Sequence, residues 1–384
     1  MTTFLLWVAI VTLVLTAVSV LDLVLGNRRV IALRDVPPAW QGETPRVSIV
    51  VAARNEQRHI QEALQSLLGL AYPNYEIIVV DDRSDDDTGV ILDRMAHKQL
   101  RLKVIHVDAL PAGWLGKNHA LWVGSQRATG DLLLFTDADI FMEPSVVSRA
   151  VAFVKEHRLD HLAVTPSVHM PTLFLAMFGA SFIIYFSLFA RPWKARDPKS
   201  RCHIGIGAFN LVSAAAYRQV GGHQPIRLRP DDDIKLGKIL KKGGFRADVA
   251  FAPDMLSVEW YASVGEAIRG LEKNAFSGAD YNIPLVLMGV LFHLLCSIWP
   301  FVAIFLTGGP VRLIYLAVVA LIMFAVADST RFHGSRSWYA LGYPLTSALF
   351  VYIMLRTMLL NLLQGGIYWR GTFYSLKELK ANRV

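Results

Sequence analysis

Several apolar runs, each long enough to cross a lipid bilayer, constrain this sequence more than any other feature. A helix of about 20 apolar residues spans the hydrocarbon core of a membrane, which is about 30 Å thick. The runs cover residues 4–25, 284–306, 311–327 and 338–363. The chain is 53% hydrophobic and 18% charged, whereas soluble domains are about 45–50% apolar and about 25% charged. We therefore expect an integral membrane protein and exclude a disordered or fibrous chain.

The first run reads as an uncleaved anchor. A cleaved signal peptide carries its positive charge before the apolar run and a small-residue cleavage site after it. Here the charge follows the run, at Arg28, Arg29 and Arg34. The excess of Lys and Arg on the cytoplasmic side of membrane proteins then predicts that the following domain is cytoplasmic. We expect this orientation in a bacterial inner membrane.

The number of membrane crossings in the C-terminal third stays open. Three crossings would place the basic tail, residues 364–384, outside the cell, against the charge rule. One run is therefore re-entrant or broken, with Pro344 and Arg356 as candidate positions, or the tail is an exception. A further apolar run, residues 173–190, is interfacial, re-entrant or a buried core helix.

These patterns predict that the chain is divided into four regions. They are an N-terminal transmembrane anchor (1–27), a cytoplasmic domain (28–283) that includes the interfacial segment 173–190, C-terminal transmembrane helices (284–363) and a basic tail (364–384).

Net charge and cysteine content exclude several other classes of protein. Lys and Arg number 39 and Asp and Glu 31, which gives a net charge of +8. This modest excess suits anionic lipids or phosphate-bearing substrates and is too diffuse to indicate nucleic acid. Cys202 and Cys296 lie far apart without CxxC spacing, so neither a disulfide framework nor a structural zinc site is expected.

The cytoplasmic domain alternates apolar strands with helical segments. Strands are expected over residues 46–53, 76–80, 102–107 and 131–136, and helices over residues 60–70 and 117–128. This alternation predicts an α/β fold with a doubly wound, mostly parallel sheet. Ligands bind such sheets beyond the carboxyl ends of the strands.

Acidic and amide residues follow three of these strands where a ligand would bind. They are Asn55 and Glu56, Asp81 and Asp82, and Asp137 and Asp139. A carboxylate there can accept hydrogen bonds from a base or ribose, or hold a hard cation. The Asp137-Ala138-Asp139 pattern suits Mg²⁺ or Mn²⁺ bridging to phosphates, although an isolated pattern of this kind often marks only a turn or helix cap.

Asp231-Asp232-Asp233 form another acidic cluster, the third after Asp81-Asp82 and Asp137-Asp139. This cluster precedes a helical segment at residues 235–242. A carboxylate within reach of a hydroxyl can act as a general base. Acidic residues also stabilise the N-terminus of a helix, and both interpretations can hold together.

Taken in order, these motifs resemble those of membrane-bound family 2 glycosyltransferases with the GT-A fold. The resemblance extends over residues 46–277. It rests on Ala53-Arg54-Asn55-Glu56, Val80-Asp81-Asp82-Arg83-Ser84-Asp85-Asp86, Gly116-Lys117-Asn118, Thr136-Asp137-Ala138-Asp139, Gly221-Gly222-His223 and Asp232-Asp233-Ile234-Lys235-Leu236-Gly237.

The resemblance implies a role for each motif. It implies contacts to the nucleoside from Asn55, Glu56 and Asp82 with support from Asp81, a donor-site role for Lys117, a metal-diphosphate site at Asp137 and Asp139, and a general base at Asp233 with Asp232 beside it. Asp139 is the favoured direct metal ligand, and Mg²⁺ or Mn²⁺ is the expected cofactor.

The implied function is inverting transfer of a sugar from a nucleotide-sugar, expected to be a UDP-hexose, to a hydroxyl of a membrane lipid. The alternative is a processive or oligosaccharide-building polysaccharide synthase, but the QxxRW motif of many processive relatives is missing near residues 260–274. A nucleotidyltransferase would need a glycine-rich basic loop where Ala53-Arg54-Asn55-Glu56 stands. A non-catalytic scaffold would be expected to lose an acidic motif, and all three are intact.

Overall fold

The computed structural model describes residues 2–38 and 44–384, and these form two compact units. The sheet unit comprises the described residues of Val30–Val168, Pro192–Glu259 and Ala381–Val384. The helical unit comprises the chain up to Arg29, His169–Arg191 and Trp260–Lys380. Residues 169–191 and 260–283, which the prediction placed within the 28–283 domain, thus group with the apolar helices, and the last four residues group with the sheet.

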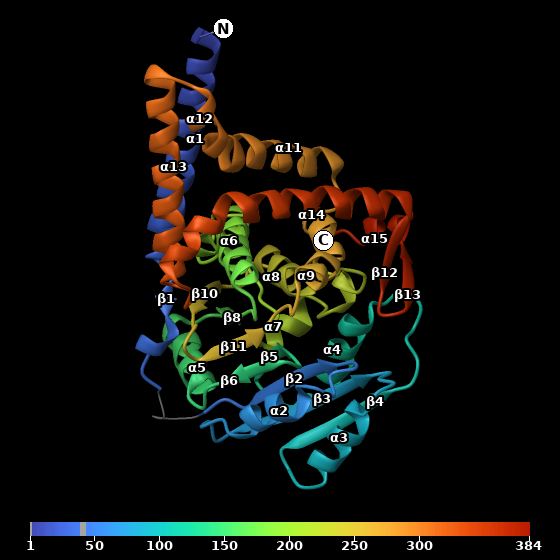
Figure 1. Cartoon of the computed structure of the whole chain (residues 1–384). Coiled ribbons are helices and arrows are strands. Elements are labelled where there is room, and N and C mark those ends of the chain that lie inside the picture. Colours follow the sequence, from blue (N-terminus) through green and yellow to red (C-terminus); the bar gives the residue numbers. More distant parts are fainter. Residues whose placement is uncertain (1, 39–43) are drawn as a thin grey trace. The chain divides into compact units, whose positions relative to one another are not determined.

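The sheet unit contains a mostly parallel sheet, which confirms the predicted α/β fold (Figure 1). In spatial order its described strands are β1 (Ile31–Ala32), β10 (Ala247–Phe251), β7 (His161–Thr165), β9 (Asn210–Ser213), β5 (Leu132–Asp137), β2 (Val47–Ala53), β3 (Tyr75–Asp82) and β4 (Leu102–Val107). Strand β9 is antiparallel to both of its neighbours, and the other described pairs are parallel. A smaller sheet has the order β6 (Ile140–Met142), β11 (Leu256–Glu259), β8 (Ser167–His169).

Helices cover both faces of the main sheet. They are α2 (Ile60–Leu68), α3 (Thr88–Ala96), α4 (Gly116–Arg127), α5 (Val146–His157), α7 (Ala214–Gln219) and α8 (Asp232–Lys242). Successive side chains of a strand point to opposite faces. In β2, Ile49 and Val51 join the apolar cluster that contains residues of α2 and α5, whereas Val50 joins the cluster that contains residues of α4 and α8. Burial on both faces is typical of parallel sheets.

The register of the strands places the predicted acidic motifs at one edge of the sheet. Ala53 of β2 is paired with Asp81 of β3, and Ala52 of β2 is paired with Asp137 of β5. Since neighbouring strands lie about 4.8 Å apart, the ends of β3 and β5 flank the end of β2. The loop that carries Asn55 and Glu56 therefore begins between the other two motifs.

The start of α8 packs directly on the loop that precedes β9, main chain against main chain. A Cβ added at Gly237 would lie 1.8 Å from the carbonyl oxygen of Ile204, and one added at Gly205 would lie 1.8 Å from that of Asp233. No side chain can replace either hydrogen without moving the backbone. These two glycines therefore set how closely Asp233 approaches the carboxyl edge of the sheet.

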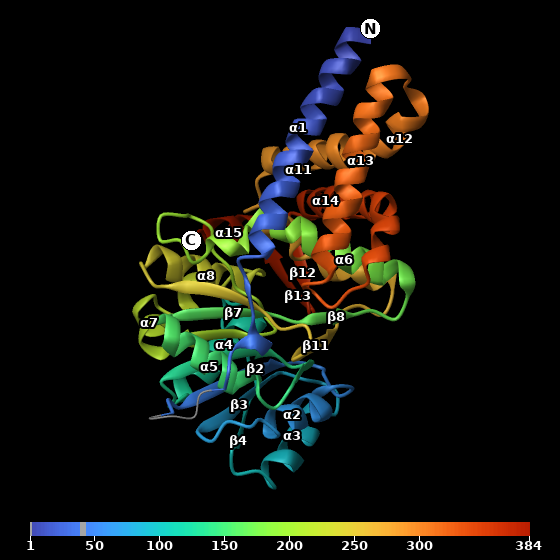
Figure 2. The ribbon, with the colours of Figure 1, turned by 90° about the vertical axis from the view of Figure 1, so that its left-hand side faces the viewer.

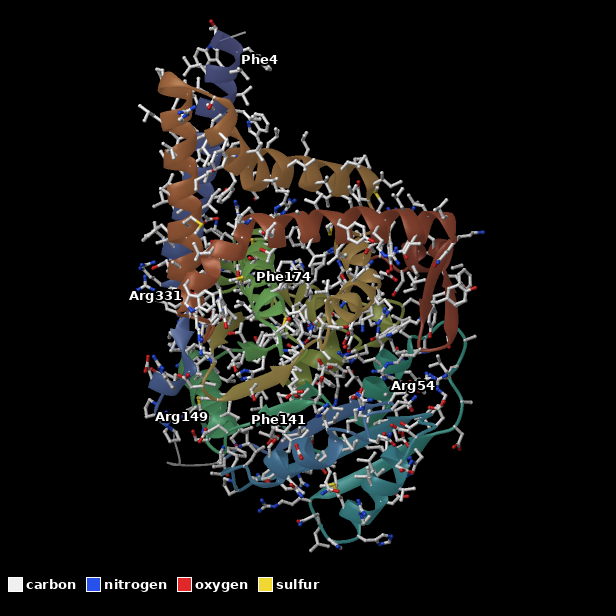
Figure 3. The ribbon with its side chains drawn as sticks, in the orientation of Figure 1. Phe4, Arg54, Phe141, Arg149, Phe174 and Arg331 are labelled. Atoms are coloured by element: carbon white, nitrogen blue, oxygen red, sulfur yellow. The ribbon has the colours of Figure 1, made fainter. Side chains whose placement is uncertain are left out.

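The helical unit contains the apolar runs. Its elements are α1 (Thr2–Asn27), α6 (Leu173–Ala190), α9 (Val264–Glu272), α10 (Ala275–Gly278), α11 (Ile283–His293), a π-helical turn (Leu294–Ile298), α12 (Trp299–Leu306), α13 (Gly309–Thr330), α14 (Tyr343–Leu363) and a hairpin of β12 (Gly366–Trp369) and β13 (Thr372–Ser375), with α15 (Leu376–Ala381) after it. Among the described residues, five segments are long and apolar enough to span a membrane: Thr3–Asn27, Leu173–Lys194, Ile283–Leu306, Gly309–Thr330 and Ser337–Leu363. Phe4, near the N-terminal end of α1 in Figure 3, is 70% exposed, as expected of a side chain that faces lipid.

Helices α1 and α13 lie side by side and run in the same direction (Figures 1 and 2). Their C-terminal ends are joined by ion pairs, since the Arg28 guanidinium donates to both carboxylate oxygens of the buried Asp328, over 2.8 and 2.9 Å. Asn27 also donates to Ser329 over 3.2 Å. Helix α14 runs across the direction of α1 and α13 in Figure 1.

Helix α6 packs on α14 through polar as well as apolar contacts. The hydroxyl groups of Ser181 and Thr346 are 2.8 Å apart, and those of Tyr185 and Ser347 are 2.5 Å apart. The chain leaves the sheet unit before α6 and returns to it directly afterwards.

A buried carboxylate ties together the strands at the end of the sheet opposite the acidic motifs. One oxygen of Glu76 accepts hydrogen bonds from the Ser48 hydroxyl (2.7 Å) and from the amide and hydroxyl of Thr129 (2.9 and 2.6 Å), and the other pairs with Lys103 (2.7 Å). Burial by itself would raise the pKa of Glu76, but these donors outweigh it and lower the pKa to about 2.

We predict that Glu76→Gln lowers the free energy of unfolding by about 1–3 kcal/mol at pH 7, the cost of weakening a buried charged hydrogen-bond network. Because the folded-state pKa is lowered, the contribution is complete above the unfolded value of about 4.3 and is lost as the pH falls toward 2. Unfolding in detergent at pH 7, 5 and 3.5 should show the same difference in stability at pH 7 and 5 and a smaller difference between wild type and variant at pH 3.5. Glu62→Gln, at an exposed position of α2, is the control, and equal stability of wild type and Glu76→Gln at pH 7 would contradict the prediction.

Candidate active site

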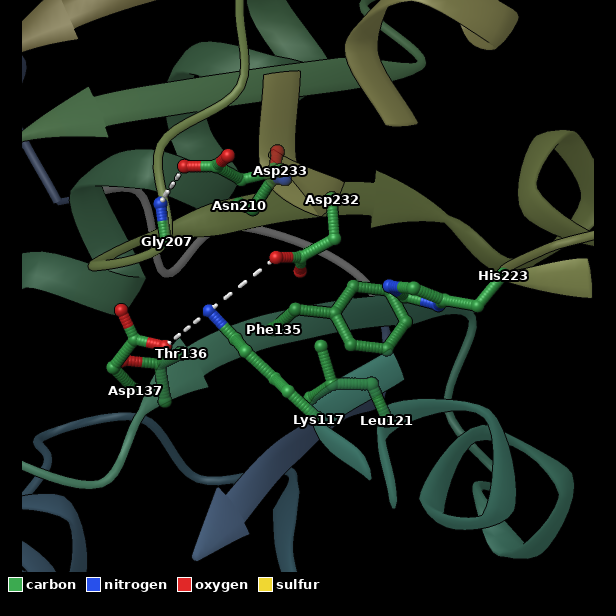
Figure 4. A pocket seen from close by; sticks show the side chains of 10 residues that line it. All are labelled: Lys117, Leu121, Phe135, Thr136, Asp137, Gly207, Asn210, His223, Asp232 and Asp233. Atoms are coloured by element: carbon green, nitrogen blue, oxygen red, sulfur yellow. Dashed lines mark hydrogen bonds and ion pairs between the residues drawn. The ribbon is translucent and has the colours of Figure 1, made fainter. Parts of the chain in front are cut away.

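A lysine brings together carboxylates from two other elements at the carboxyl edge of the sheet (Figure 4). The Lys117 ammonium, in the first turn of α4, lies 2.6 Å from Asp137 at the end of β5 and 3.7 Å from Asp232 at the start of α8. Burial favours the neutral amine, but Asp137, Asp232 and Asp233 together hold the pKa of Lys117 above its usual value. Lys117 is therefore a permanent cation at this site.

A pocket surrounds this lysine. Its lining has an apolar side formed by Leu121 and Phe135 and a polar side that carries the charges. The lining residues are Lys117, Leu121, Phe135, Thr136, Asp137, Gly207, Asn210, His223, Asp232 and Asp233. The pocket thus unites motifs that lie about a hundred residues apart in the sequence.

The main chain holds the Asp233 carboxylate in place. The amide of Gly207 donates to one oxygen over 2.8 Å, and the amide of Ile234 donates to the other over 2.8 Å. Desolvation and the neighbouring Asp232 raise the pKa of Asp233, and Lys117 opposes the rise. A positioned carboxylate with a raised pKa has the properties of a general base.

Asp231, the first residue of the acidic cluster, is engaged in a separate ion pair. The buried Arg229 guanidinium donates to both of its carboxylate oxygens over 3.0 Å, and Lys235 lies 3.4 Å away. Asp232 and Asp233, by contrast, line the pocket. Asp232 and Asp233 therefore face the pocket, whereas Asp231 is held by Arg229 and Lys235.

The carboxylates of Asp139 and Glu56 add further negative charge near Asp137. Desolvation, followed by the charges of Asp137 and Glu56, raises the pKa of Asp139. Carboxylates that repel one another in this way suit a divalent cation, which prefers oxygen ligands. In residues 2–38 and 44–384, no group of three or more His, Cys, Asp or Glu side chains is arranged to hold a metal ion. A cation at Asp137 and Asp139 would therefore need further ligands from a substrate.

The loop after β2 is tied to the loop after β3. Asn55 has a left-handed backbone (φ 57°), and its side-chain oxygen accepts from the amide of Asp85 over 3.0 Å. Its own amide donates to the Ser84 hydroxyl over 3.0 Å, and the amide of Glu56 donates to the Thr88 hydroxyl over 2.8 Å. Asn55 therefore joins the two loops beside the pocket.

Partners within the protein also hold Asp81 and Asp82. The Arg83 guanidinium donates to both oxygens of Asp82 over 2.8 and 3.0 Å, while His106 lies 3.0 Å from Asp81. A Cβ added at Gly116 would lie 2.2 Å from an Asp82 oxygen. The glycine before Lys117 thus allows the start of α4 to approach Asp82, which links this group of residues to the pocket.

The structure therefore brings Lys117, Asp137, Asp232 and Asp233 into one pocket. Asp139 interacts electrostatically with Asp137 and Lys117, and Glu56 interacts with Asp139. Asn55, Asp81 and Asp82 lie at the neighbouring strand ends. Gly207, Asn210 and His223 also line the pocket, although the sequence patterns alone do not assign them to it. The His223 ring is buried, its Nδ1 lies 2.7 Å from the Tyr217 hydroxyl, and burial together with Lys117 lowers its pKa to about 3. For Gly207, the close spacing of Gly205 and Gly207 was an available signal.

The sequence of this domain matches a known family. Residues 48–221 match the model of glycosyl transferase family 2. The 4,4'-diaponeurosporenoate glycosyltransferase of Staphylococcus haemolyticus is 24% identical over 268 residues, which is 68% of this chain and 69% of the relative. The enzyme of the same name from Staphylococcus aureus is 22% identical over 342 residues, 86% of this chain and 89% of the relative.

A solved structure shares the fold. The mannosyltransferase PcManGT from Pyrobaculum calidifontis, in complex with GDP-Man and Mn²⁺, aligns with a TM-score of 0.56 at 18% identity, over 92% of this chain and 99% of the other. This likeness supports the GT-A-like fold. The match over residues 48–221 identifies a glycosyl transferase family 2 domain within this chain.

Proposed function

We propose that this protein transfers a sugar, with inversion, from a nucleotide-sugar, in the first place a UDP-hexose, to a hydroxyl of a membrane lipid. The observation that carries the proposal is the pocket in which Lys117 faces Asp137 and Asp232 with Asp233 beside them. It places a cation that can meet a diphosphate, and a carboxylate that can help to hold a divalent metal, beside a carboxylate that can take a proton.

We assign binding of the nucleotide-sugar donor to residues at the carboxyl ends of the strands. We assign contacts with the nucleoside to the loops that carry Asn55, Glu56, Asp81 and Asp82. Asp137 and Asp139 would hold Mg²⁺ or Mn²⁺, which when bound neutralises charge that develops on the departing diphosphate. The neighbour with Mn²⁺ and GDP-Man supports this assignment. Lys117 contributes a second, permanent positive charge.

We assign deprotonation of the acceptor hydroxyl to Asp233. The acceptor oxygen attacks the anomeric carbon as the bond from that carbon to the diphosphate oxygen breaks, and the hydroxyl proton passes to the Asp233 carboxylate. Attack opposite to the leaving group inverts the anomeric configuration. Asp232 keeps Lys117 close by and raises the proton affinity of Asp233.

A membrane lipid is the acceptor class that the rest of the chain supports. Apolar side chains such as Val14, Val18 and Leu313 are more than half exposed on α1 and α13, which suits contact with lipid. The similar staphylococcal proteins are named for transfer to diaponeurosporenoate. Both observations favour an acceptor that is drawn from the bilayer.

The division of the chain supports one membrane topology. The sheet unit includes the chain on both sides of α6 and also Ala381–Val384, and a folded unit lies on one side of a bilayer. The Arg28–Asp328 pair indicates that α13 ends on the side where α1 ends. We therefore propose that α1 and α13 cross, that the chain crosses back between α10 and α13, and that α6 and α14 do not cross. The C-terminus is then cytoplasmic with the sheet unit.

Labelling of single cysteines tests this topology. In a background without Cys202 and Cys296, we expect a membrane-impermeant maleimide added to intact cells to label Gly308→Cys, between α12 and α13. Ser337→Cys and Lys377→Cys, before and after α14, should react only after the membrane is opened. Labelling of Lys377→Cys in intact cells would mean that α14 crosses and would contradict the proposal.

Transfer activity tests the proposed reaction. Membranes that contain the protein, incubated with a panel of labelled nucleotide-sugars, should yield a lipid product that mass spectrometry identifies as a hexosyl lipid. We expect Asp139→Ala to lower the rate by about a hundredfold or more, since it removes a group that supports developing charge. Asp108→Asn, at an exposed position of the same unit, should leave the rate unchanged.

The same assay has two further outcomes. Chelation of divalent cations should abolish transfer, and Mg²⁺ or Mn²⁺ should restore it. A labelled product that grows by many sugar units would indicate a polysaccharide synthase instead. Wild-type rates in Asp139→Ala would contradict the metal-diphosphate assignment.

A further inference from the structure

The segment Gln224–Arg229 leads directly into the acidic cluster at the start of α8. It contains one short 3₁₀ turn, Gln224–Ile226, and otherwise no helix or strand. A segment of this kind cannot satisfy its main-chain groups through a ladder of its own. Its position therefore depends on partners from elsewhere in the chain.

One set of partners comes from α4. The side-chain amide of the buried Asn118 donates to the carbonyl oxygens of Ile226 and Arg229, over 2.9 Å each. Next to it, the amide of Leu115 donates to the carbonyl oxygen of Arg227 over 2.9 Å. The helix that carries Lys117 thus holds the segment from one side.

The other partner comes from the end of the chain. The side-chain oxygen of Asn382 accepts from the amide of Leu228 over 2.9 Å, and its nitrogen donates to the carbonyl oxygen of Pro225 over 2.8 Å. Val384 packs against the apolar cluster that includes Leu236 and Leu240 of α8. Although the tail follows the apolar helices in sequence, its last four residues belong to the sheet unit.

The chemistry of these two bonds is specific to a primary amide. Asn382 bridges an N–H and a C=O that lie three residues apart, so its side chain must donate and accept at the same time. Aspartate would keep the acceptor but would place its second oxygen against the Pro225 carbonyl. Alanine would remove both bonds.

The segment in turn sets the position of the acids. It ends in Arg229, whose buried guanidinium holds Asp231 through two hydrogen bonds of 3.0 Å. Asp232 and Asp233 follow immediately in the first turn of α8. A shift of Pro225–Leu228 would therefore move the two pocket carboxylates relative to Lys117. Displacements of about 1 Å can cost about a hundredfold in rate.

We propose that Ala381–Val384 form a C-terminal clamp on the active site, and that Asn382 is a positioning residue that acts through Pro225–Leu228 on Asp232 and Asp233. The proposal rests on the proposed function of those two carboxylates.

Steady-state kinetics of Asn382 variants of the full-length protein test the clamp. We expect Asn382→Ala to lower kcat by about tenfold to a hundredfold, while KM for the nucleotide-sugar changes less than about threefold, since the donor residues at the strand ends lie on other elements. Asn382→Asp, which retains the acceptor but sets an anionic oxygen against the Pro225 carbonyl, should lower kcat at least as much as alanine. Lys377→Ala, at an exposed position of α15 outside the clamp, should match wild type.

Asp233→Asn, measured in parallel, separates the clamp from the proposed function. If Asp233→Asn is inactive and Asn382→Ala has the wild-type kcat, the clamp is wrong while the proposed function stands. If Asp233→Asn is fully active, the proposed function fails. A merely structural role would lower the thermal stability of Asn382→Ala without a selective loss of kcat, and that result would also overturn the clamp.

Discussion

The contact on which the site depends is the ion pair between Lys117 and Asp137, with Asp232 and Asp233 close by. Each carboxylate comes from an element that folds for its own reasons, and without a cation they would repel one another in a partly desolvated pocket. Lys117 therefore offsets the repulsion between the three carboxylates that β5 and α8 contribute to the same pocket.

Glycines allow the main chain to come close enough for this arrangement. Gly116 brings α4 toward Asp82, Gly207 leaves room beside Asp137, and Gly205 and Gly237 seat the start of α8. The acids themselves are obvious in the sequence, but their distance from one another is decided at positions that carry no side chain. This is why the pocket joins residues from Lys117 to Asp233 within a few ångströms.

The sequence predicted the parts whose signals are local. The strands up to Asp137 appeared as β-branched runs with acids at their ends, and they form parallel neighbours in the structure. It could not predict which unit residues 173–190 join, because an apolar helix packs equally well on a sheet or on other helices. It also could not predict that Asn382 meets Pro225 and Leu228, since a contact across more than 150 residues leaves no local pattern.

The central claim is that the Lys117 pocket is a glycosyl-transfer site in which Asp233 takes the acceptor proton. The most direct measurement compares nucleotide-sugar binding and turnover in Asp233→Asn, a substitution that keeps the shape of the side chain and removes its basicity. The account predicts a donor Kd within about threefold of wild type and turnover reduced by at least about a hundredfold, the scale of losing a general base. Turnover at the wild-type rate would contradict it.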